Sequence, residues 1–562
     1  MTGTNQAADV VIVNGQVHGA DASAGDATAV AVTGRRISAV GGSEIRDLIG
    51  NRTRVIDAQG GAVLPGINDG HLHFVESAVS EHGTLSVGSH VAGSWAEVVR
   101  ILEDAAPAND GWIRAHGWDE AVLGHGGPEH VFGLRPESPL VAYDQTGHQL
   151  LMNETAARLA GLDSWTGGYP DGVVGRFADG RANGLLVDAA VELAGKVVPQ
   201  LGDAELKECI VKHQRLLHSL GITSLTEPGL GPGGEGLMGG SSATRSLSLL
   251  ADLAADEELT LRINVLLLFS STGGANENDV RTGLAGDLPG SLRRRGISED
   301  LLRIAGVKIF ADGIPRSGTA WMSEPYETPC GHNHGSMVIV GNSDAEREQE
   351  LRKIIDRIHE GGLQAGIHAT GDATTDAAIA AIADAQGKNP RDARHYIIHG
   401  AFKDRETIAR FQRHGVGLST NPTIRSEAGA LMKKILGAER FDGQQPLSSL
   451  LAAGVPTNIA SDAPVTTPDW RESVIAAVTR DTTAGPGATD DPERVGFRQA
   501  LEMMTIHPAW QDHSEDRKGR LAAGYLADLC ILEKPVADDV RALRDNPTTH
   551  TISNGSLVYS AL

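Results

Sequence analysis

The sequence predicts an α/β protein: a (β/α)8 TIM-like barrel, a small β-sandwich domain built from both termini, and a large insertion after the first barrel strand. Three observations predict this fold. Strand-like apolar segments alternate with helical patterns along the middle of the chain, as they do in parallel βα units. Both ends of the chain are rich in strand patterns, and a long stretch, residues 75–205, separates the first two strand segments of the middle.

The β-sandwich is predicted from residues 1–61 and 519–562. Apolar runs flank Asn14-Gly15 near the start of the chain and Asn554-Gly555 near its end. An Asn-Gly pair between two such runs favours a tight hairpin turn. Because both ends carry this pattern and the long middle carries another, we expect the two ends to meet in one domain.

The barrel is predicted from eight strand-like segments, each of which opens into a polar or glycine-rich loop. Residues 62–74 hold the first barrel strand, residues 75–205 form an inserted subdomain over the active site, and residues 206–518 complete the barrel. The eight segments are residues 62–73, 221–229, 261–269, 302–313, 363–372, 395–401, 415–422 and 455–464.

Helical signals lie between the strand segments. Ser343, followed three residues later by Glu346, has the pattern of a capping box, which begins a helix. Apolar residues then recur at helical spacing until Gly361, which is a stop signal. The predicted apolar face consists of Leu351, Ile354, Ile355 and Ile358.

Bulk properties narrow the class of protein. The chain has 562 residues and a net charge of -23, which argues against nucleic acid or an anionic membrane as a partner. Its cysteines, Cys209, Cys330 and Cys530, are odd in number and far apart, unlike a disulfide framework. A basic, apolar leader and a run of about 18 apolar residues are both absent from the sequence. We therefore expect a cytoplasmic protein that acts on a small molecule and forms a homo-oligomer, with a dimer as the first expectation.

Two histidines, His71 and His73, stand two residues apart at the end of the first strand segment. Residues i and i+2 of a strand face the same side, so both imidazoles can point at one metal ion in the barrel mouth. A lone His-x-His also arises from surface or structural histidines. The pair by itself therefore does not decide between the two interpretations.

Lys308 stands between Val307 and Ile309 in an apolar strand segment, where an unpaired ammonium group would be strongly disfavoured. One interpretation is a salt bridge to an acid such as Asp312. The other is reaction of the amine with carbon dioxide, which turns the cation into an anionic carbamate able to bridge two metal ions. The lysine alone favours the salt bridge.

Three further polar residues, His368, His399 and Asp462, lie at or just beyond the C-terminal ends of later strand segments. These ends form the face where barrel active sites occur. Each alone has an ordinary explanation, as a core histidine or a helix cap. With the residues above they give four imidazoles and two carboxylate-type oxygen donors, a ligand set suited to zinc. We therefore predict a metal site formed by His71, His73, Lys308, His368, His399 and Asp462.

The chain resembles the amidohydrolase superfamily over nearly its whole length, and most closely the family-3 branch that includes N-substituted formamide deformylases. The resemblance implies two Zn2+ ions per chain, or another divalent metal, bridged by a carboxylated Lys308. By the same resemblance, one metal is held by His71, His73, His368 and Asp462, and Lys308 and His399 complete the second site. The matching motifs are VLPGINDGHLH, GVKIFADG, GIHATGD, GVPTNIASDAP, TIHPAW at 505–510 and EDRKGRLAAGYLADLCIL at 515–532.

The sequence also departs from the pattern of this branch. Ile398 precedes His399 where an acid is usual, so the support of that histidine by a neighbouring group is in question. Asn421-Pro422 replaces a commoner glutamine-proline pair, and Asp188 replaces a more usual glutamate. These changes concern the surroundings of the substrate, so a substrate cannot be copied from a relative.

The expected chemistry is hydrolysis of a C–N bond in a small amide, such as an N-formyl or N-acyl amine. A hydroxide held between two metals would attack the carbonyl carbon. It would form near neutral pH because zinc lowers the pKa of bound water to roughly 7 in known sites. Asp462 would pass the proton of this hydroxide to the leaving amine. A metal, helped by a histidine for which His399 is our candidate, would polarise the carbonyl oxygen.

Candidate substrate contacts come from the insertion and from the barrel loops. Arg316 could instead pair with an acid, and a tryptophan in a subdomain of this size is usually part of the core. The candidates are His148, Trp118, Asp119, Arg316 and Asn421.

Other functions fit the same scaffold. Deamination, ester or lactone hydrolysis and decarboxylation are alternatives, although deaminases of the superfamily typically use one metal and lack the bridging lysine. A non-catalytic scaffold protein is a further alternative. Such relatives usually lose metal ligands, whereas all six predicted ligands are present here.

Overall fold

A parallel eight-stranded sheet forms the centre of the protein, in a computed structural model that describes residues 7–19, 26–165, 172–231, 243–270, 273–286, 288–327, 331–400 and 404–561. Each strand coincides with one of the eight predicted segments, and the order along the sheet follows the order along the chain. The predicted barrel is therefore confirmed. Its strands are β7 (Ile67–Asp69), β14 (Ile222–Leu230), β15 (Arg262–Leu267), β16 (Leu302–Phe310), β17 (Gln364–Ala369), β18 (Tyr396–His399), β19 (Gly417–Thr420) and β20 (Thr457–Ile459).

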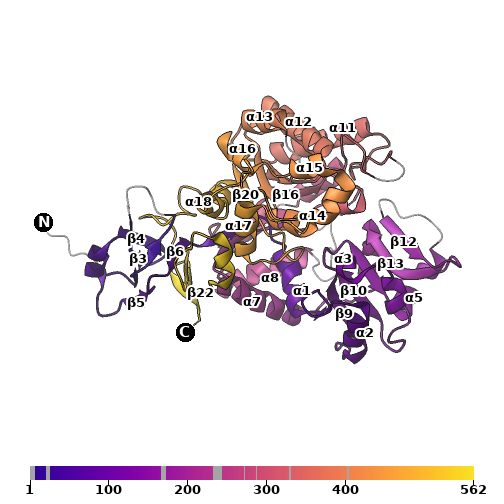
Figure 1. Cartoon of the computed structure of the whole chain (residues 1–562), viewed down its shortest axis with the longest axis horizontal. Coiled ribbons are helices and arrows are strands. Elements are labelled where there is room, and N and C mark those ends of the chain that lie inside the picture. The colour runs from indigo at the N-terminus through magenta and orange to yellow at the C-terminus, as the bar shows by residue number, and fades with distance from the viewer. Residues whose placement is uncertain are drawn as a thin grey trace.

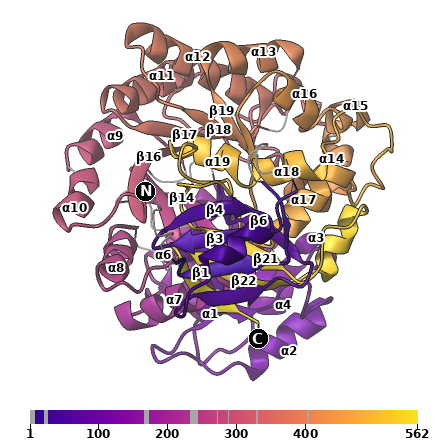
Figure 2. The ribbon, with the colours of Figure 1, turned by 90° about the vertical axis from the view of Figure 1, so that its left-hand side faces the viewer.

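Helices cover the outside of this sheet (Figure 2). The predicted helix start and stop are confirmed at α11, where the Ser343 hydroxyl accepts from the Glu346 N–H and Gly361 ends the helix. The second bond of the capping box differs, because the Glu346 carboxylate accepts from the Asn342 N–H. The predicted apolar face of α11 is buried. The helices are α1 (Phe74–His82), α7 (Asp203–Ser219), α8 (Ala243–Ala255), α9 (Glu277–Leu284), α10 (Leu288–Arg294), α11 (Asp344–Glu360), α12 (Asp372–Lys388), α13 (Arg405–His414), α14 (Pro422–Leu436), α15 (Ala438–Asp442), α16 (Leu447–Ala452), α17 (Trp470–Thr479), α18 (Phe497–Met503) and α19 (Ile506–Gln511).

Two small sheets at one end of the molecule combine strands from both ends of the chain (Figure 1). Ile12 and Val30 of the first sheet share one apolar core with Leu529 and Ile552 of the second. The first sheet has the order β4 (Arg36–Gly41), β3 (Ala29–Thr33), β1 (Val10–Val13), β5 (Arg54–Asp57). The second has the order β2 (Gln16–Val17), β6 (Ala62–Pro65), β21 (Leu529–Leu532), β22 (Thr548–Ser553), β23 (Ser556–Ser560).

The first predicted barrel segment, residues 62–73, is divided between two sheets. Its first part is β6, which pairs with β21 in the terminal sheet, and only β7 belongs to the barrel. The break falls at Pro65-Gly66. A Cβ atom on Gly66 would lie 2.1 Å from the Thr223 hydroxyl oxygen, so the chain can pass this close to β14 only without a side chain.

A six-stranded sheet with its own helices forms from residues between α1 and α7. It lies at the end of the molecule away from the terminal sheets (Figure 1). Its strands have the order β12 (Gly172–Arg176), β13 (Ala182–Asp188), β11 (Gln149–Met152), β10 (Leu140–Asp144), β9 (Ile113–Trp118), β8 (Leu85–Ser86). Its helices are α2 (Trp95–Asp104), α3 (Glu120–Leu123), α4 (Gly127–Val131), α5 (Glu154–Leu159) and α6 (Glu192–Gly195).

Cys209 and Cys530 are buried free thiols, and Cys330 lies outside the described residues. Among the helices of the described part of the chain, none combines the length and the apolar character that a membrane crossing requires.

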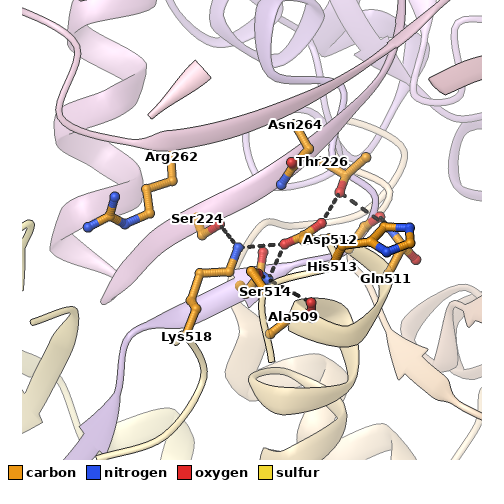
Figure 3. Close-up of polar contacts among 12 residues, drawn as sticks. Ser224, Thr226, Arg262, Asn264, Ala509, Gln511, Asp512, His513, Ser514 and Lys518 are labelled. Carbon is orange, nitrogen blue, oxygen red and sulfur yellow. Dashed lines mark hydrogen bonds and ion pairs between the residues drawn. The ribbon is translucent and has the colours of Figure 1, made fainter. Parts of the chain in front are cut away.

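A buried ion pair lies near the N-terminal ends of the first two barrel strands (Figure 3). The Lys518 ammonium lies 2.5 Å from Asp512 Oδ2 and donates to the Ser224 hydroxyl of β14 at 2.8 Å. Asn68 of β7 donates to the same Asp512 carboxylate at 2.8 Å. This pair therefore ties the segment after α19 to the first two barrel strands.

We predict that Lys518→Met lowers the free energy of unfolding by about 3–5 kcal/mol, because it leaves the Asp512 carboxylate buried without its counter-charge. Urea unfolding followed by intrinsic fluorescence measures the loss. The matched control is Lys388→Met, which removes an exposed lysine paired with Asp356 and should leave the midpoint nearly unchanged. Equal midpoints for the two variants would contradict a stabilising role of the buried pair.

His213 of α7 is a buried imidazole that packs between the rings of Phe74 and His82, and neither ring nitrogen has a hydrogen-bond partner. Burial, and next the neighbouring His82, lower the pKa of His213 to about 3. The unfolded chain therefore binds a proton at this residue near pH 6.5 and the folded protein does not. The contribution of the neutral His213 ring to the free energy of unfolding is fully present above pH 6.5. It is lost as the pH falls toward 3.

We accordingly predict that His213→Phe reduces the acid sensitivity of the protein. Lowering the pH from 7.5 to 5 should reduce the free energy of unfolding of the wild-type protein by about 2 kcal/mol through His213. Phenylalanine has no such proton to bind, so this part of the loss should disappear. Urea unfolding at both pH values measures the difference for each protein. An unchanged difference in His213→Phe would show that the His213 pKa is not depressed in the folded state.

Candidate metal centre

The six predicted ligands come from five strands and converge at the C-terminal ends of those strands. His71 and His73 follow β7, Lys308 lies in β16, and His368 lies in β17. His399 ends β18, and Asp462 comes three residues after β20. The parallel register of the sheet places all of these positions at one mouth of the barrel.

Asp462 lies at the centre of the group. Its Oδ1 is 3.1 Å from His71 Nε2 and 3.5 Å from His73 Nε2, and its Oδ2 is 4.0 Å from His399 Nδ1. One ligand atom from each of His71, His73 and Asp462 can be chosen so that all three lie within 4.8 Å of one another. A single ion can therefore contact the three residues.

The remaining two imidazoles extend this group. The His399 ring lies 5.5 Å from the His71 ring and 4.7 Å from the His368 ring, centroid to centroid. His368 Nε2 is 3.1 Å from the Gly313 carbonyl oxygen, to which it can donate. The four histidines and Asp462 thus form one continuous cluster, as predicted from their positions at the strand ends.

Lys308 is buried beside this cluster without a carboxylate within 4.0 Å, among the residues that the structure describes. Asp312, the alternative partner, instead accepts hydrogen bonds from the backbones of Thr370 and Gly371. Burial lowers the pKa of the Lys308 amine to about 8. A lowered pKa provides neutral amine near physiological pH, which is the form that reacts with carbon dioxide.

The electrostatics of the cluster fit a bound cation. His71 is fully buried, and its Nδ1 has no hydrogen-bond partner. Burial, and then the charge of Lys308, hold the His71 pKa well below its usual range. Burial alone would raise the pKa of Asp462, but the adjacent His71 and His73 hold it well below its ordinary value. A neutral His71 imidazole beside an ionised carboxylate suits a divalent metal. At His73 burial acts to lower the pKa, but the hydrogen bond to Asp462 and the charge of Glu76 outweigh it and raise the pKa.

Two of these residues have a left-handed backbone. His399 has φ 70° and Asp462 has φ 59°. Residues other than glycine adopt this conformation at a cost of about 1–3 kcal/mol, and such residues cluster at functional sites. The surrounding strands therefore hold both side chains in the cluster against a local backbone preference.

Neighbouring polar groups orient two of the histidines. Asn421 Oδ1 lies 2.7 Å from His399 Nδ1, and the Asn421 amide also donates to the Ala460 carbonyl. Glu76 Oε2 lies 3.3 Å from His73 Nδ1. Each contact engages one ring nitrogen of the histidine and so determines where the other nitrogen of the same ring points. Asn421 thus supplies the support that Ile398 cannot give, while Glu76, one helical turn after His73, escaped the sequence analysis.

A cavity of about 490 Å³ opens in front of the cluster. Its walls include Lys308 and Asp462, and also four of the five predicted substrate contacts: Asp119, His148, Arg316 and Asn421.

Two of these cavity residues are paired with each other. The Arg316 guanidinium lies 2.6 Å from the Asp119 carboxylate, which links the insertion to the loop after β16. Arg316 therefore pairs with an acidic side chain, which was the alternative interpretation of this residue.

Trp118 occupies a different place from the one predicted. It is buried in the inserted subdomain, where its indole N–H donates to the Ala142 carbonyl and its ring packs against Trp95. It is not among the residues that line the cavity. We therefore correct its assignment from a substrate contact to a core residue of the subdomain. The side chain of Asp188 lies outside the described part of the structure.

Comparisons with known proteins bear on the family and the fold of the chain. The model of the amidohydrolase family matches residues 54–559. Protein LONG AFTER FAR-RED 3 of Arabidopsis thaliana is 28% identical over 93% of this chain and 87% of its own length. The N-substituted formamide deformylase of Arthrobacter pascens is 26% identical over 99% of each chain. An uncharacterized metal-dependent hydrolase from Pyrococcus furiosus shares the fold with a TM-score of 0.69, at 23% identity, over 93% of this chain and 99% of its own.

We predict that Lys308→Ala lowers the metal content of the zinc-supplemented protein, because a carboxylated Lys308 would supply an oxygen ligand that alanine lacks. Mass spectrometry of the metal measures the content. Lys353→Ala, which changes an exposed lysine of α11, is the control. A carbamate carbon signal after growth with 13C-labelled bicarbonate should appear in wild type and be absent from Lys308→Ala. Equal metal content in the two variants would contradict a ligand role for Lys308.

Proposed function

Because the chain belongs to the amidohydrolase family, we propose that it hydrolyses the C–N bond of a small N-formyl or N-acyl amine with bound zinc. One observation carries this proposal. Four imidazoles, a carboxylate and a buried lysine without a carboxylate partner in the described structure meet beside a cavity large enough for a small organic substrate. The kinship with an N-substituted formamide deformylase supports the choice of bond.

Bound zinc would supply Lewis acidity, which activates water and polarises the carbonyl group of the substrate. His71, His73, His368, His399 and Asp462 would hold it, together with a carboxylated Lys308.

Asp462 is the residue to which we assign proton transfer. It is ionised, it lies at the centre of the cluster, and it faces the cavity. It can therefore accept the proton of the attacking water and deliver it to the nitrogen of the leaving amine. An amine needs this proton more than an alkoxide does, which favours amide over ester cleavage. Glu76 and Asn421 would act by orienting His73 and His399.

We predict that the zinc-loaded protein hydrolyses N-benzylformamide, and that Asp462→Asn lowers kcat by at least about 100-fold, because it removes the group that transfers the proton. Release of benzylamine, followed by chromatography, measures the rate. The control is Asp384→Asn, which changes an exposed acid of α12 paired with Arg352.

The same assay is run with N-benzylacetamide, benzyl formate and an aminated heterocycle. Exclusive turnover of the ester would favour an ester hydrolase, and release of ammonia from the heterocycle would favour a deaminase. Stoichiometric zinc with turnover of none of these compounds would contradict the proposal.

A further inference from the structure

Arg425 is a cation on the wall of the active-site cavity. It lies in the first turns of α14, directly after the strand β19 and after Asn421, and it lines the same cavity as Lys308 and Asp462. No acidic side chain lies within 4.0 Å of its guanidinium group in the described part of the chain. Arg425 is half-buried, and charged side chains that are removed from water are usually paired.

The contacts of Arg425 within the protein are weak. Its Nη1 is 3.4 Å from the Arg480 carbonyl oxygen, and its Nε is buried without a hydrogen-bond partner. Its guanidinium carbon lies 4.8 Å from the centroid of the Phe441 ring, on which it stacks. Burial, and next the charge of Arg480, lower the pKa of Arg425 to about 10. The group is therefore still charged at neutral pH, and several of its five N–H donors remain available.

The other charged groups near Arg425 are paired or do not pair with it. Arg480, whose carbonyl Arg425 contacts, is itself paired with Asp491 at 2.7 Å. Arg316 is paired with Asp119 at 2.6 Å. Glu427 lines the cavity, but its pKa is raised to about 7 by loss of hydration and by the carboxylates of Glu472 and Asp119. Of the two arginines that line the cavity in the described part of the chain, Arg425 is thus the one without an acidic partner.

A second polar group of the cavity also lacks a partner. Gln444 is 4% exposed and lines the cavity, and its Oε1 has no hydrogen-bond partner. Rotation of this amide by 180° would present its NH2 group instead. The lining of the cavity also includes apolar side chains: Val122, Ile314, Ile424, Leu431, Met432 and Val465.

We propose that Arg425 forms an anion subsite in this cavity, and that the substrate is an N-formyl or N-acyl amine whose amine part ends in a carboxylate. The acyl group would lie at the metal cluster, an apolar stem would cross the apolar wall, and the carboxylate would receive two parallel hydrogen bonds from the planar guanidinium group. This inference rests on the proposed function for the position of the scissile bond. It assigns Arg425 a role in specificity and none in the bond-breaking step.

The first test compares matched substrates on the zinc-loaded, full-length protein. N-formyl derivatives of linear ω-amino acids with three to six carbons are each paired with the N-formyl alkylamine that lacks the carboxylate. At the best chain length, the acid should have a kcat/KM at least about tenfold higher than its neutral partner. Arg425→Gln should reduce this ratio to near one, mainly through KM, and Arg425→Lys should retain part of it. Arg498→Gln, an exposed arginine of α18 paired with Glu502, should keep the wild-type ratio.

The second test measures binding without turnover. Methanesulfonyl derivatives of the same amino acids and alkylamines cannot be hydrolysed as amides, and calorimetric titration gives their Kd values. Tighter binding of the acid that disappears in Arg425→Gln supports the subsite. Equal binding of acid and neutral compound at every length would overturn it. So would a preference that persists in Arg425→Gln, because the carboxylate would then bind the metals or another cation.

The two tests separate the failure of each proposal. A carboxylate preference in binding, without hydrolysis of any formamide, would contradict the C–N hydrolase and leave the anion subsite supported. Hydrolysis of the neutral formamides without any preference for a carboxylate would support the hydrolase and overturn the subsite.

Discussion

The whole site depends on the junction between the first and the last strand of the barrel. The Asp462 N–H donates to the His71 carbonyl, and the His73 N–H donates to the Ala463 carbonyl, each at 2.9 Å. These two backbone bonds bring residues nearly 400 positions apart in the chain into one rigid unit. The carboxylate of Asp462 can lie between two imidazoles only because the chain after β20 closes against the chain after β7. A change that loosens this junction would therefore disturb three ligands at once.

The cluster is an unfavourable arrangement without a cation. Lys308, His71 and Asp462 are all buried, and the charges of Lys308 and Asp462 are not matched by an ion pair between them. Buried ionised groups cost several kcal/mol each unless they are paired. Two of the residues also have a backbone conformation with positive φ. Burial of the large apolar core offsets this free-energy cost. Metal binding would reduce the cost, so the affinity for metal and the stability of the barrel are coupled.

The sequence predicted the barrel strands best, because each strand is a short apolar run that ends in polar or glycine-rich residues. All eight barrel segments were predictable because parallel strands covered on both faces read as short apolar runs, and the six candidate ligands lie at or near the ends of five of them. The first segment was predicted too long because the division at Pro65-Gly66 depends on a close approach to Thr223, which is a tertiary contact. Trp118 was misplaced for the same reason, since the sequence does not reveal which face of β9 covers Trp95.

The residues that escaped the sequence analysis are those whose roles depend on what surrounds them. Glu76 looks like an ordinary acid of an amphipathic helix until His73 is placed beside it. Arg425 looks like any arginine after a helix start, and only the absence of a nearby acid in the described structure distinguishes it. The candidate metal ligands lie at strand ends that the barrel holds in fixed register, whereas other parts of the cavity lining come from α14, the loop after β16 and the insertion. Substitutions in these other parts can therefore change which substrate is bound without replacing a candidate ligand, since they belong to different elements.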